Sequence, residues 1–180
     1  MTSTQLDCGD SIVLRAPLLS DAAAIATHAN DRNVWINLRD AMPHPYSFDD
    51  AQHWLGSMRE QDRVSMFAID REGEAIGAIS LVLGTDIERR SAELGYWVGS
   101  AFWGRGIATA AVRRICDYAF TDLALLRVFA TPMTGNARSK RVLEKARFTL
   151  EGIMRSCYVK DDTIVDAALY ARIAPSQRAL

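Results

Sequence analysis

Apolar and polar positions along the chain form a pattern that predicts helices and strands in mixed order. Alternating or continuous apolar runs bounded by turn residues predict strands near 11–16, 64–71, 75–84, 91–99, 125–131, 149–160 and 163–173. Segments with helical spacing predict helices near 20–38 with a break at Asn30–Asp31, then 48–62, 106–121 and 136–146. A proline-bearing loop covers 41–47, and Lys160–Thr163 is predicted to close a C-terminal hairpin. This order is typical of a mixed α/β protein.

The segment 106–121 has the clearest helical periodicity. Ile107, Ala111, Ile115 and Ala119 recur every four residues, so they share one face of a helix. The charged residues of the segment fall outside this stripe. We therefore expect the stripe to be buried.

A loop that contains two glycines separates the strand predicted at 91–99 from this helix. Gly104 and Gly106 lack Cβ atoms and Ala108 is nearly as small, so a ligand could approach the backbone closely. The first turn of a helix has N–H groups without intrahelical partners and a partial positive charge, which suits a phosphate. A tight turn that binds nothing is the alternative interpretation of this loop taken alone.

Two common phosphate-binding loops do not fit this segment. A Walker loop needs Gly-Lys followed by Ser or Thr, and this sequence does not occur in the chain. A dinucleotide-binding fingerprint would place a third glycine where Thr109 stands, and it normally lies in an N-terminal βαβ unit. The sequence therefore favours a phosphate site of another kind.

A second segment strengthens the phosphate interpretation. The apolar run 125–130 is followed by the turn residues Thr134–Asn136 and by a short predicted helix. Asn136 is a candidate N-cap of that helix, and Ser139, three positions later, shares its face. For this segment alone, helix capping and ligand contact explain Asn136 equally well. Its combination with the glycine loop favours a ligand site.

Composition and charge limit the class of protein. The 180 residues with 49% hydrophobic content suit one domain over 1–180, with a core at about 11–174. A net charge of −1 gives little support for nucleic-acid binding, and no apolar run is long enough to cross a membrane. The N-terminal residues lack the basic and apolar regions of a secretion signal. Three widely spaced cysteines argue for reduced thiols in the cytoplasm and against disulfides or a metal site.

Several motifs match one enzyme family over nearly the whole chain. They are Glu-Leu-Gly-Tyr-Trp-Val at 93–98, Trp-Gly-Arg-Gly-Ile-Ala-Thr at 103–109, Asn136-x-x-Ser139 with Arg-Val-Leu-Glu-Lys at 141–145, Phe148 with Glu-Gly at 151–152, and Asp-Ala-Ala-Leu-Tyr at 166–170. Leu-Arg-Ala-Pro at 14–17 with Asp21, and Pro-His-Pro-Tyr at 43–46, are similar too. On these residues the chain resembles the GCN5-related N-acetyltransferases (GNAT), in the branch that includes the ribosomal-protein N-terminal acetyltransferases of RimJ and RimL type.

Two positions depart from the pattern of that family. Arg147 stands where a glycine usually precedes the phenylalanine at the helix exit, and we expect it to alter the end of the helix. Trp103 occupies the first position of the cofactor loop, where much of the wider family has Gln or Arg. This residue is usual for the branch, so cofactor binding is expected to persist.

The resemblance implies a fold and a cofactor. The expected fold is the acetyltransferase α/β fold, with a central, mostly antiparallel sheet that splays at the strands 91–99 and 125–131 and is flanked by helices. Acetyl-CoA is the implied co-substrate, its pantetheine arm lying in that gap, and no metal is implied. The implied cofactor contacts are Trp97, Val98, Gly104, Arg105, Gly106, Ile107, Ala108, Thr109, Asn136, Ser139 and Lys140.

The resemblance also suggests catalytic roles. Glu93 is the candidate base that removes the amine proton, directly or through water, and its alternative role is an ion pair with an arginine across strands. The backbone N–H near Val98 is the candidate donor to the oxyanion. Ser139 is the candidate acid for the CoA thiolate. Tyr170 is the second candidate acid, and its alternative role is that of a strand tyrosine held by Asp166 or packed in the core.

The acceptor is the least defined part of the prediction. An α-amine with a pKa near 7.7–8.0 is roughly a quarter neutral at about pH 7.4, whereas a lysine is about 0.1% neutral. A protein or peptide N-terminus therefore needs less help from a base and is slightly favoured. A polyamine, an amino acid or an antibiotic remains open, as do a sensor that binds acetyl-CoA without turnover and a homodimer. Trp35 and Tyr46 are candidate substrate contacts.

Overall fold

The computed structural model describes residues 4–57 and 64–175. Within these ranges the helices and strands are β1 (Leu6–Gly9), β2 (Ile12–Arg15), α1 (Ala22–Ala29), α2 (Arg32–Trp35), α3 (Phe48–Ser57), β3 (Val64–Arg71), β4 (Glu74–Leu83), β5 (Ser91–Val98), α4 (Ile107–Thr121), β6 (Arg127–Ala130), α5 (Ala137–Lys145), β7 (Thr149–Lys160) and β8 (Thr163–Ile173). Short 3-10 helices precede α1 at Leu19–Asp21 and follow β5 at Ser100–Phe102.

The strands in the described part of the chain form one mixed sheet. Their order is β1-β2-β3-β4-β5-β6-β8-β7. Neighbouring strands are antiparallel except β5 and β6, which run parallel. The predicted mixed, mostly antiparallel α/β sheet is therefore confirmed.

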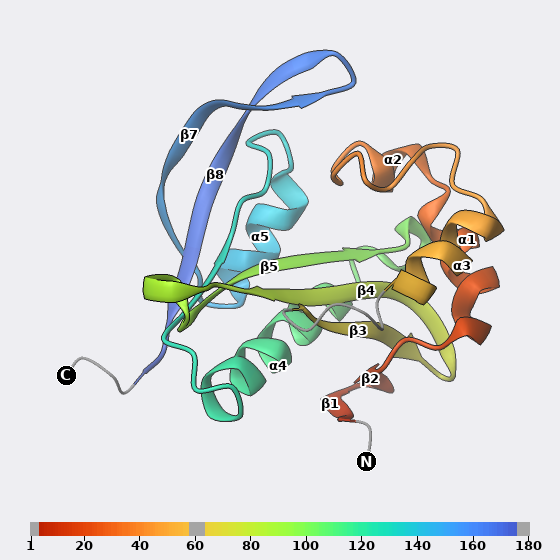
Figure 1. The fold of residues 1–180 in the computed structure, drawn as a ribbon, viewed down its shortest axis with the longest axis horizontal. Coiled ribbons are helices and arrows are strands. Elements are labelled where there is room, and N and C mark those ends of the chain that lie inside the picture. Colours follow the sequence, from red (N-terminus) through yellow and green to blue (C-terminus); the bar gives the residue numbers. More distant parts are fainter. Residues whose placement is uncertain (1–3, 58–63, 176–180) are drawn as a thin grey trace.

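The parallel pairing between β5 and β6 ends early. The last paired residues are Glu93 and Phe129, whereas β5 continues along β4 to Val98. On its other edge β6 pairs with β8 from Arg127 to Ala130, and Figure 1 shows β7 and β8 rising away from β3, β4 and β5. The sheet therefore opens along the second half of β5, as the resemblance implied.

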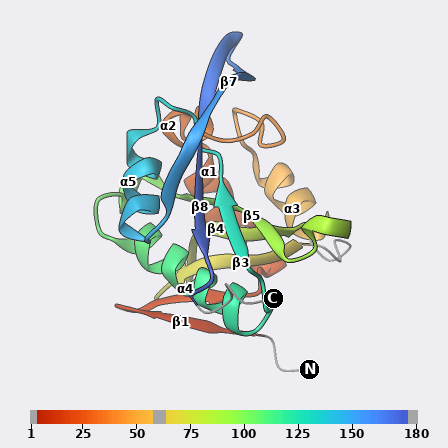
Figure 2. The ribbon, with the colours of Figure 1, turned by 90° about the vertical axis from the view of Figure 1, so that its left-hand side faces the viewer.

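Helices cover both faces of the sheet. Figure 2 shows α1 and α3 on one side of β3–β5 and α4 on the other. The predicted stripe of α4 (Ile107, Ala111, Ile115 and Ala119) is buried in the larger core. A second core lies between α1, α3 and the opposite face of the sheet. The sheet is therefore sandwiched where it carries β5.

The structure changes some of the predicted boundaries. β1 was not predicted, because a strand of four residues that ends in a turn with positive φ at Gly9–Ser11 has too short a pattern. The predicted break at Asn30–Asp31 is present, and the Asp31 side chain caps α2. The strand predicted at 125–131 shortens to Arg127–Ala130. The predicted helix 48–62 is described only to Ser57, and its remainder lies outside the described residues.

Arg15 joins three elements at the edge of the second core. Its Nη1 and Nη2 donate to the two carboxylate oxygens of Asp21 at 2.8 Å each, and its Nε donates to Asp70 Oδ2 at 2.8 Å. Burial opposes ionisation of Asp21, but hydrogen bonds from Arg15 and from the Leu18 N–H outweigh burial and hold its pKa below the usual value. These bonds fix the start of α1 against β2 and β3.

Arg147 does not alter the end of α5, contrary to expectation. The Phe148 N–H donates to the Leu143 carbonyl and the Arg147 N–H to the Glu144 carbonyl, both at 3.0 Å, which is a Schellman motif. Arg147 adopts the required left-handed conformation with φ of 67°. An L-residue in this region costs about 1–2 kcal/mol. The departure from glycine is therefore accommodated as backbone strain, not as a changed helix end.

We predict that Arg147→Gly stabilises the fold. Glycine removes the Cβ clash, and its larger unfolded-state entropy offsets part of the gain, which leaves about 0.5–1 kcal/mol of added unfolding free energy. In a chain of this size the midpoint of thermal unfolding should rise by about 2–3 °C. Arg147→Ala is the control, because it removes the guanidinium but keeps the Cβ. Equal midpoints for the two variants would contradict the strain.

Candidate active site

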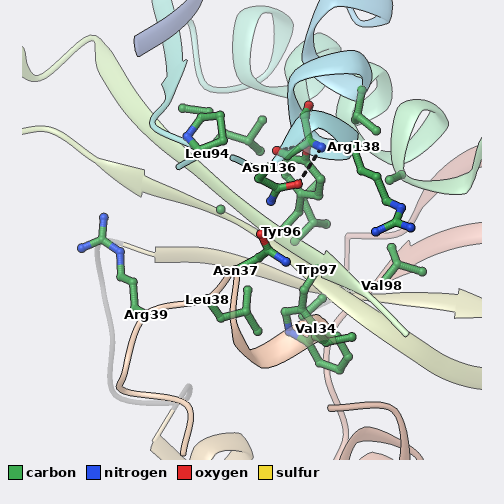
Figure 3. Close-up of a pocket in the computed structure, with 18 of the residues that line it drawn as sticks. Val34, Asn37, Leu38, Arg39, Leu94, Tyr96, Trp97, Val98, Asn136 and Arg138 are labelled. Carbon is green, nitrogen blue, oxygen red and sulfur yellow. Dashed lines mark hydrogen bonds between the residues drawn. The ribbon is translucent and has the colours of Figure 1, made fainter. Parts of the chain in front are cut away.

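A cavity of about 1070 Å³ lies where β5 and β6 diverge. Its walls are the second half of β5, the loop and first turn of α4, one face of α5, the end of β7 and residues 37–42 after α2. We call the part beside α4 and α5 the helix end, and the part beside Arg39, Glu93, Tyr158 and Lys160 the hairpin end. Figure 3 shows Arg138 and Arg39 on opposite sides of the cavity.

The helix end contains an open helix N-terminus. Gly104 and Gly106 have φ of 77° and 81°, and a Cβ built on either would meet no atom within 4 Å. Gly106 is the N-cap of α4 and supplies no side-chain hydrogen bond. Ile107, Ala108 and Thr109 of the first turn line the cavity. Their backbone N–H groups are therefore available to an anion.

Cations of α5 also face the helix end. Arg138, Arg141 and Lys145 line the cavity. They lie at i, i+3 and i+7, which is one face of a helix. The Arg138 guanidinium lies 4.6 Å from the centre of the Trp103 ring. This basic stripe could have been found from spacing alone.

Two residues predicted to contact the cofactor lie elsewhere. Lys140 falls between the positions of the basic stripe and is not among the residues that line the cavity. Arg105 is also not among them, and its guanidinium lies 5.8 Å from the centre of the Phe102 ring. Trp97, Val98, Asn136 and Ser139 do line the cavity, as do the predicted residues of the glycine loop and first turn of α4.

The register of β5 leaves backbone groups directed into the gap. The Gly99 N–H donates to the Ile76 carbonyl at 2.9 Å, so the odd-numbered residues of β5 are those that bond to β4. Tyr96 and Val98 therefore direct their backbone groups to the other edge, beyond the last pair with β6. The Val98 carbonyl accepts a hydrogen bond from Trp103 Nε1 at 2.7 Å. The Val98 N–H remains directed at the cavity.

Side chains of β5 alternate between the two faces of the sheet. Leu94, Tyr96 and Val98 pack toward the core of α4 and α5. Trp97 packs toward the core of α1 and α3, and Glu93 shares its face. Glu93 and Tyr96 therefore approach the cavity from opposite sides of the strand.

Tyr96 and Ser139 form a pair that the sequence analysis missed. Their side-chain oxygens lie 2.8 Å apart, and the Ser139 N–H donates to Asn136 Oδ1 at 3.0 Å (Figure 3). Asn136 is therefore the N-cap of α5, as predicted. Burial raises the pKa of Tyr96 to about 12, although the Ser139 hydrogen bond acts in the opposite direction. The alternation of side chains along β5 could have predicted this pair, since it directs Tyr96 toward α5.

Glu93 forms the ion pair that was its alternative role. Its Oε1 accepts from Arg39 Nη2 at 2.6 Å and from Thr131 Oγ1 at 3.2 Å. Thr131 Oγ1 in turn accepts from the Tyr158 hydroxyl at 2.7 Å. The arginine comes from the segment after α2 and not from a neighbouring strand. The side chain of Glu93 keeps 28% of its surface exposed.

Three other candidates lie outside the cavity lining. The Tyr170 hydroxyl donates to Glu144 Oε1 at 2.9 Å, and the side chain is buried against α5. Tyr46 is a residue of the second core with 3% of its surface exposed. Trp35 stacks on His44 with ring centres 5.5 Å apart. The geometry supports neither a proton-donating role for Tyr170 nor a substrate contact by Tyr46.

Ion pairs join the tip of the β7–β8 hairpin to the segment around α2. Lys160 Nζ donates to Asp40 Oδ1 at 2.6 Å and lies 3.9 Å from the centre of the Trp35 ring. Arg32 Nη2 donates to Asp161 Oδ2 at 2.6 Å. Figure 1 shows the hairpin tip and α2 facing each other across the top of the molecule. These contacts bound the hairpin end of the cavity, with Trp35 behind Lys160.

No group of three or more His, Cys, Asp or Glu side chains in residues 4–57 and 64–175 is placed to hold a metal ion. In the same ranges, no helix combines the length and the apolar character that a bilayer span requires.

Known proteins share this sequence pattern. The sequence model of the acetyltransferase (GNAT) domain matches residues 11–149. YdaF of Bacillus subtilis is 43% identical over 84 residues, which are 47% of this chain and 45% of that protein. The ribosomal-protein-serine acetyltransferase of Escherichia coli is 31% identical over 122 residues, or 67% of this chain and 66% of the relative. The match to YdaF thus spans less than half of its length.

A solved structure shares the fold. RimJ of Mycobacterium smegmatis, determined in complex with CoA-disulfide, superposes with a TM-score of 0.86 at 27% identity and covers 98% of this chain and 89% of RimJ. The superposition of RimJ on nearly the whole chain and the domain match over residues 11–149 both indicate the same family. The chain belongs to the GNAT family of acetyltransferases.

Proposed function

We propose that this N-acetyltransferase moves the acetyl group of acetyl-CoA to a primary amine, with the α-amine of a protein or peptide N-terminus as the favoured acceptor. The observation that carries the proposal is the open N-terminus of α4 at the end of the splayed strand β5. The E. coli relative, a ribosomal-protein-serine acetyltransferase, and the CoA-disulfide bound by RimJ support it.

The helix end fits the polar part of acetyl-CoA. The N–H groups of the first turn of α4 and the cations Arg138, Arg141 and Lys145 suit a pyrophosphate and a further phosphate. The free backbone groups of Tyr96 suit the amides of a pantetheine arm laid along β5. When bound, acetyl-CoA would supply the activated acetyl thioester. Arg105 and Lys140 are not needed for this fit.

The Val98 N–H is the proposed donor to the oxyanion that forms when the amine attacks the thioester carbonyl. Preorganised donors of this kind stabilise developing charge without reorganising. Glu93 lies five residues earlier on the same strand, roughly 16 Å away at about 3.3 Å per residue. This distance favours transfer of the amine proton to Glu93 through water during the attack, after Glu93 has attracted the arriving ammonium ion.

Ser139 is the proposed donor of a proton to the departing CoA thiolate. Its Oγ lies at the start of α5 and is hydrogen-bonded to the Tyr96 hydroxyl. A tyrosine is protonated at neutral pH, and burial raises the pKa of Tyr96 further, to about 12. It can therefore resupply a proton to Ser139. Removal and delivery of protons then occur on opposite faces of β5.

Two other functions are alternatives to acetyl transfer to a protein or peptide N-terminus. A small free amine is the alternative acceptor, and a sensor that binds acetyl-CoA without turnover is the non-catalytic alternative. Release of CoA thiol with any acceptor would exclude the sensor.

We also propose a cytoplasmic enzyme, because Cys8, Cys116 and Cys157 are free thiols. A single domain over 1–180 and a homodimer remain proposals to be tested by proteolysis and by sedimentation.

We predict that Gly106→Glu weakens CoA binding at least tenfold, about 1.4 kcal/mol in binding free energy. The substitution places bulk and negative charge beside the open N–H groups of α4. Calorimetric titration with CoA measures the effect. Gly73→Glu is the matched control, because Gly73 also has positive φ and open surroundings but lies in the β3–β4 turn. CoA affinity equal to the parent's in the Gly106 variant would refute the phosphate site.

We predict that Glu93→Gln lowers kcat by about 10²-fold at neutral pH while CoA affinity stays near the parent's. The deficit should shrink as pH rises, because more acceptor amine is then neutral. Rates of thiol release from pH 6 to 9 measure both effects. Glu151→Gln is the control, since it breaks an arginine–glutamate pair of β7 outside this cavity. An unchanged rate at every pH would remove Glu93 from the mechanism.

We predict that acetylation occurs at α-amines. The test is a competition between peptides with free and with blocked N-termini, each with an internal lysine, beside spermidine and free amino acids. Mass spectrometry should find the acetyl group on the free N-terminus. Acetylation confined to lysine side chains or to the small amines would overturn the acceptor preference and leave acetyl transfer intact.

A further inference from the structure

The hairpin end holds an ion pair that the incoming amine has to rearrange. Arg39 and Glu93 are joined through one hydrogen bond, from Nη2 to Oε1 at 2.6 Å. The Arg39 side chain is 74% exposed, and among the described residues it makes no other hydrogen bond. Most of the donors of its guanidinium are therefore directed to solvent at the mouth of the cavity.

The pairing conflicts with the proposed role of Glu93. A primary amine arrives largely as an ammonium ion, which Glu93 attracts and Arg39 repels. If the ammonium replaces Arg39 on Glu93, the guanidinium loses its partner beside a new positive charge. An acceptor with one positive group and nothing else leaves this conflict unresolved.

An acceptor that also carries a carboxylate resolves the conflict. Its ammonium would pair with Glu93 and its carboxylate with Arg39, so one ion pair is exchanged for two. Bidentate pairing of a carboxylate with a guanidinium is specific in geometry, and Arg39 has the free donors for it. The exposed side chain of Arg39 can swing outward with little loss of packing.

The other charges of the cavity do not take this role. Lys160 has 3% of its side-chain surface exposed and is paired with Asp40 at 2.6 Å. Asp40, which follows Arg39 in the chain, is balanced by that same bond. Arg138 lies at the helix end, across the cavity from Arg39 (Figure 3). Arg39 is the cation whose partner is also the proposed base.

We propose that Arg39 selects acceptors in which a carboxylate lies next to the reacting amine. The inference rests on the proposed acetyl transfer and defines its substrate class. The carboxylate is an acidic side chain in the first or second residue of a peptide, or the α-carboxylate of a free amino acid. Binding of this group releases Glu93 from its ion pair and makes it available for the amine proton.

The test compares matched acceptors by thiol release at saturating acetyl-CoA. One pair of peptides begins Ser-Asp and Ser-Asn, with blocked C-termini, and a second pair is alanine and alaninamide. In each pair the shape is nearly constant and the carboxylate is present or absent. We expect a kcat/KM at least tenfold higher for the carboxylate member of at least one pair. The pair that shows this difference distinguishes a peptide side-chain carboxylate from the α-carboxylate of a free amino acid.

Variants of Arg39 separate selectivity from structure. In Arg39→Gln the ratio of kcat/KM between the carboxylate and the neutral acceptor should fall to about one. The kcat/KM of the carboxylate acceptor should decrease, while that of the neutral acceptor should stay unchanged or increase. Arg39→Lys should keep a preference, because the charge remains. Arg127→Gln is the matched control: Arg127 also pairs with a glutamate, but outside this cavity, and its loss should leave the ratio unchanged.

Failures of the two proposals are distinguishable. No thiol release with any acceptor would overturn acetyl transfer itself and this inference with it. Equal use of both members of each pair by the parent enzyme would overturn the role of Arg39 alone. An equal loss for both members in Arg39→Gln would also overturn it, because Arg39 would then support the fold and not the choice of acceptor.

Discussion

The early end of the parallel pairing between β5 and β6 is the constraint on which the site depends. Backbone N–H and C=O groups that leave a sheet ladder have to find other partners. Here the groups of Tyr96 and Val98 face a cavity of about 1070 Å³, and the Val98 carbonyl is already bonded to Trp103. The remaining groups are free for a ligand with its own donors and acceptors. A fully paired β5 would bury these groups and abolish the cavity.

The two-residue period of the same strand separates the chemistry into two sides. Glu93 shares a face with Trp97, and Tyr96 lies on the opposite face beside Ser139. In the proposed mechanism, a thioester held in the gap would have the proposed proton acceptor on one side and the proposed proton donor on the other. The acceptor side carries paired charges, Arg39 with Glu93 and Lys160 with Asp40. The donor side is buried, which raises the pKa of Tyr96 to about 12. The alternation therefore gives the two proton transfers different dielectric surroundings.

Local patterns predicted the elements, and long-range contacts decided the site. The stripe of α4, the break at Asn30–Asp31 and the N-cap at Asn136 follow from spacing and capping chemistry, and the structure has all three. The mixed sheet was predicted from family motifs, because the sequence pattern of a single segment does not determine which strand it pairs with. Arg39 reaches Glu93 and Lys160 reaches Asp40 across large separations in sequence, which no periodicity encodes. Sequence alone also does not distinguish an aromatic residue of a core from one of a cleft, and Tyr46, a candidate substrate contact, lies buried in the second core.

Trp103 shows how a departure from the wider family can be built into the site. Its indole N–H bonds the Val98 carbonyl, and its ring lies under the Arg138 guanidinium. A glutamine or arginine at this position would extend a polar side chain toward phosphate, whereas the tryptophan ties the end of β5 to the first turn of α5. In the proposed phosphate site the charge comes from Arg138, whose guanidinium lies over this ring. The indole therefore links the end of β5, which carries the proposed oxyanion donor, to the start of α5, which carries a cation of the proposed phosphate site.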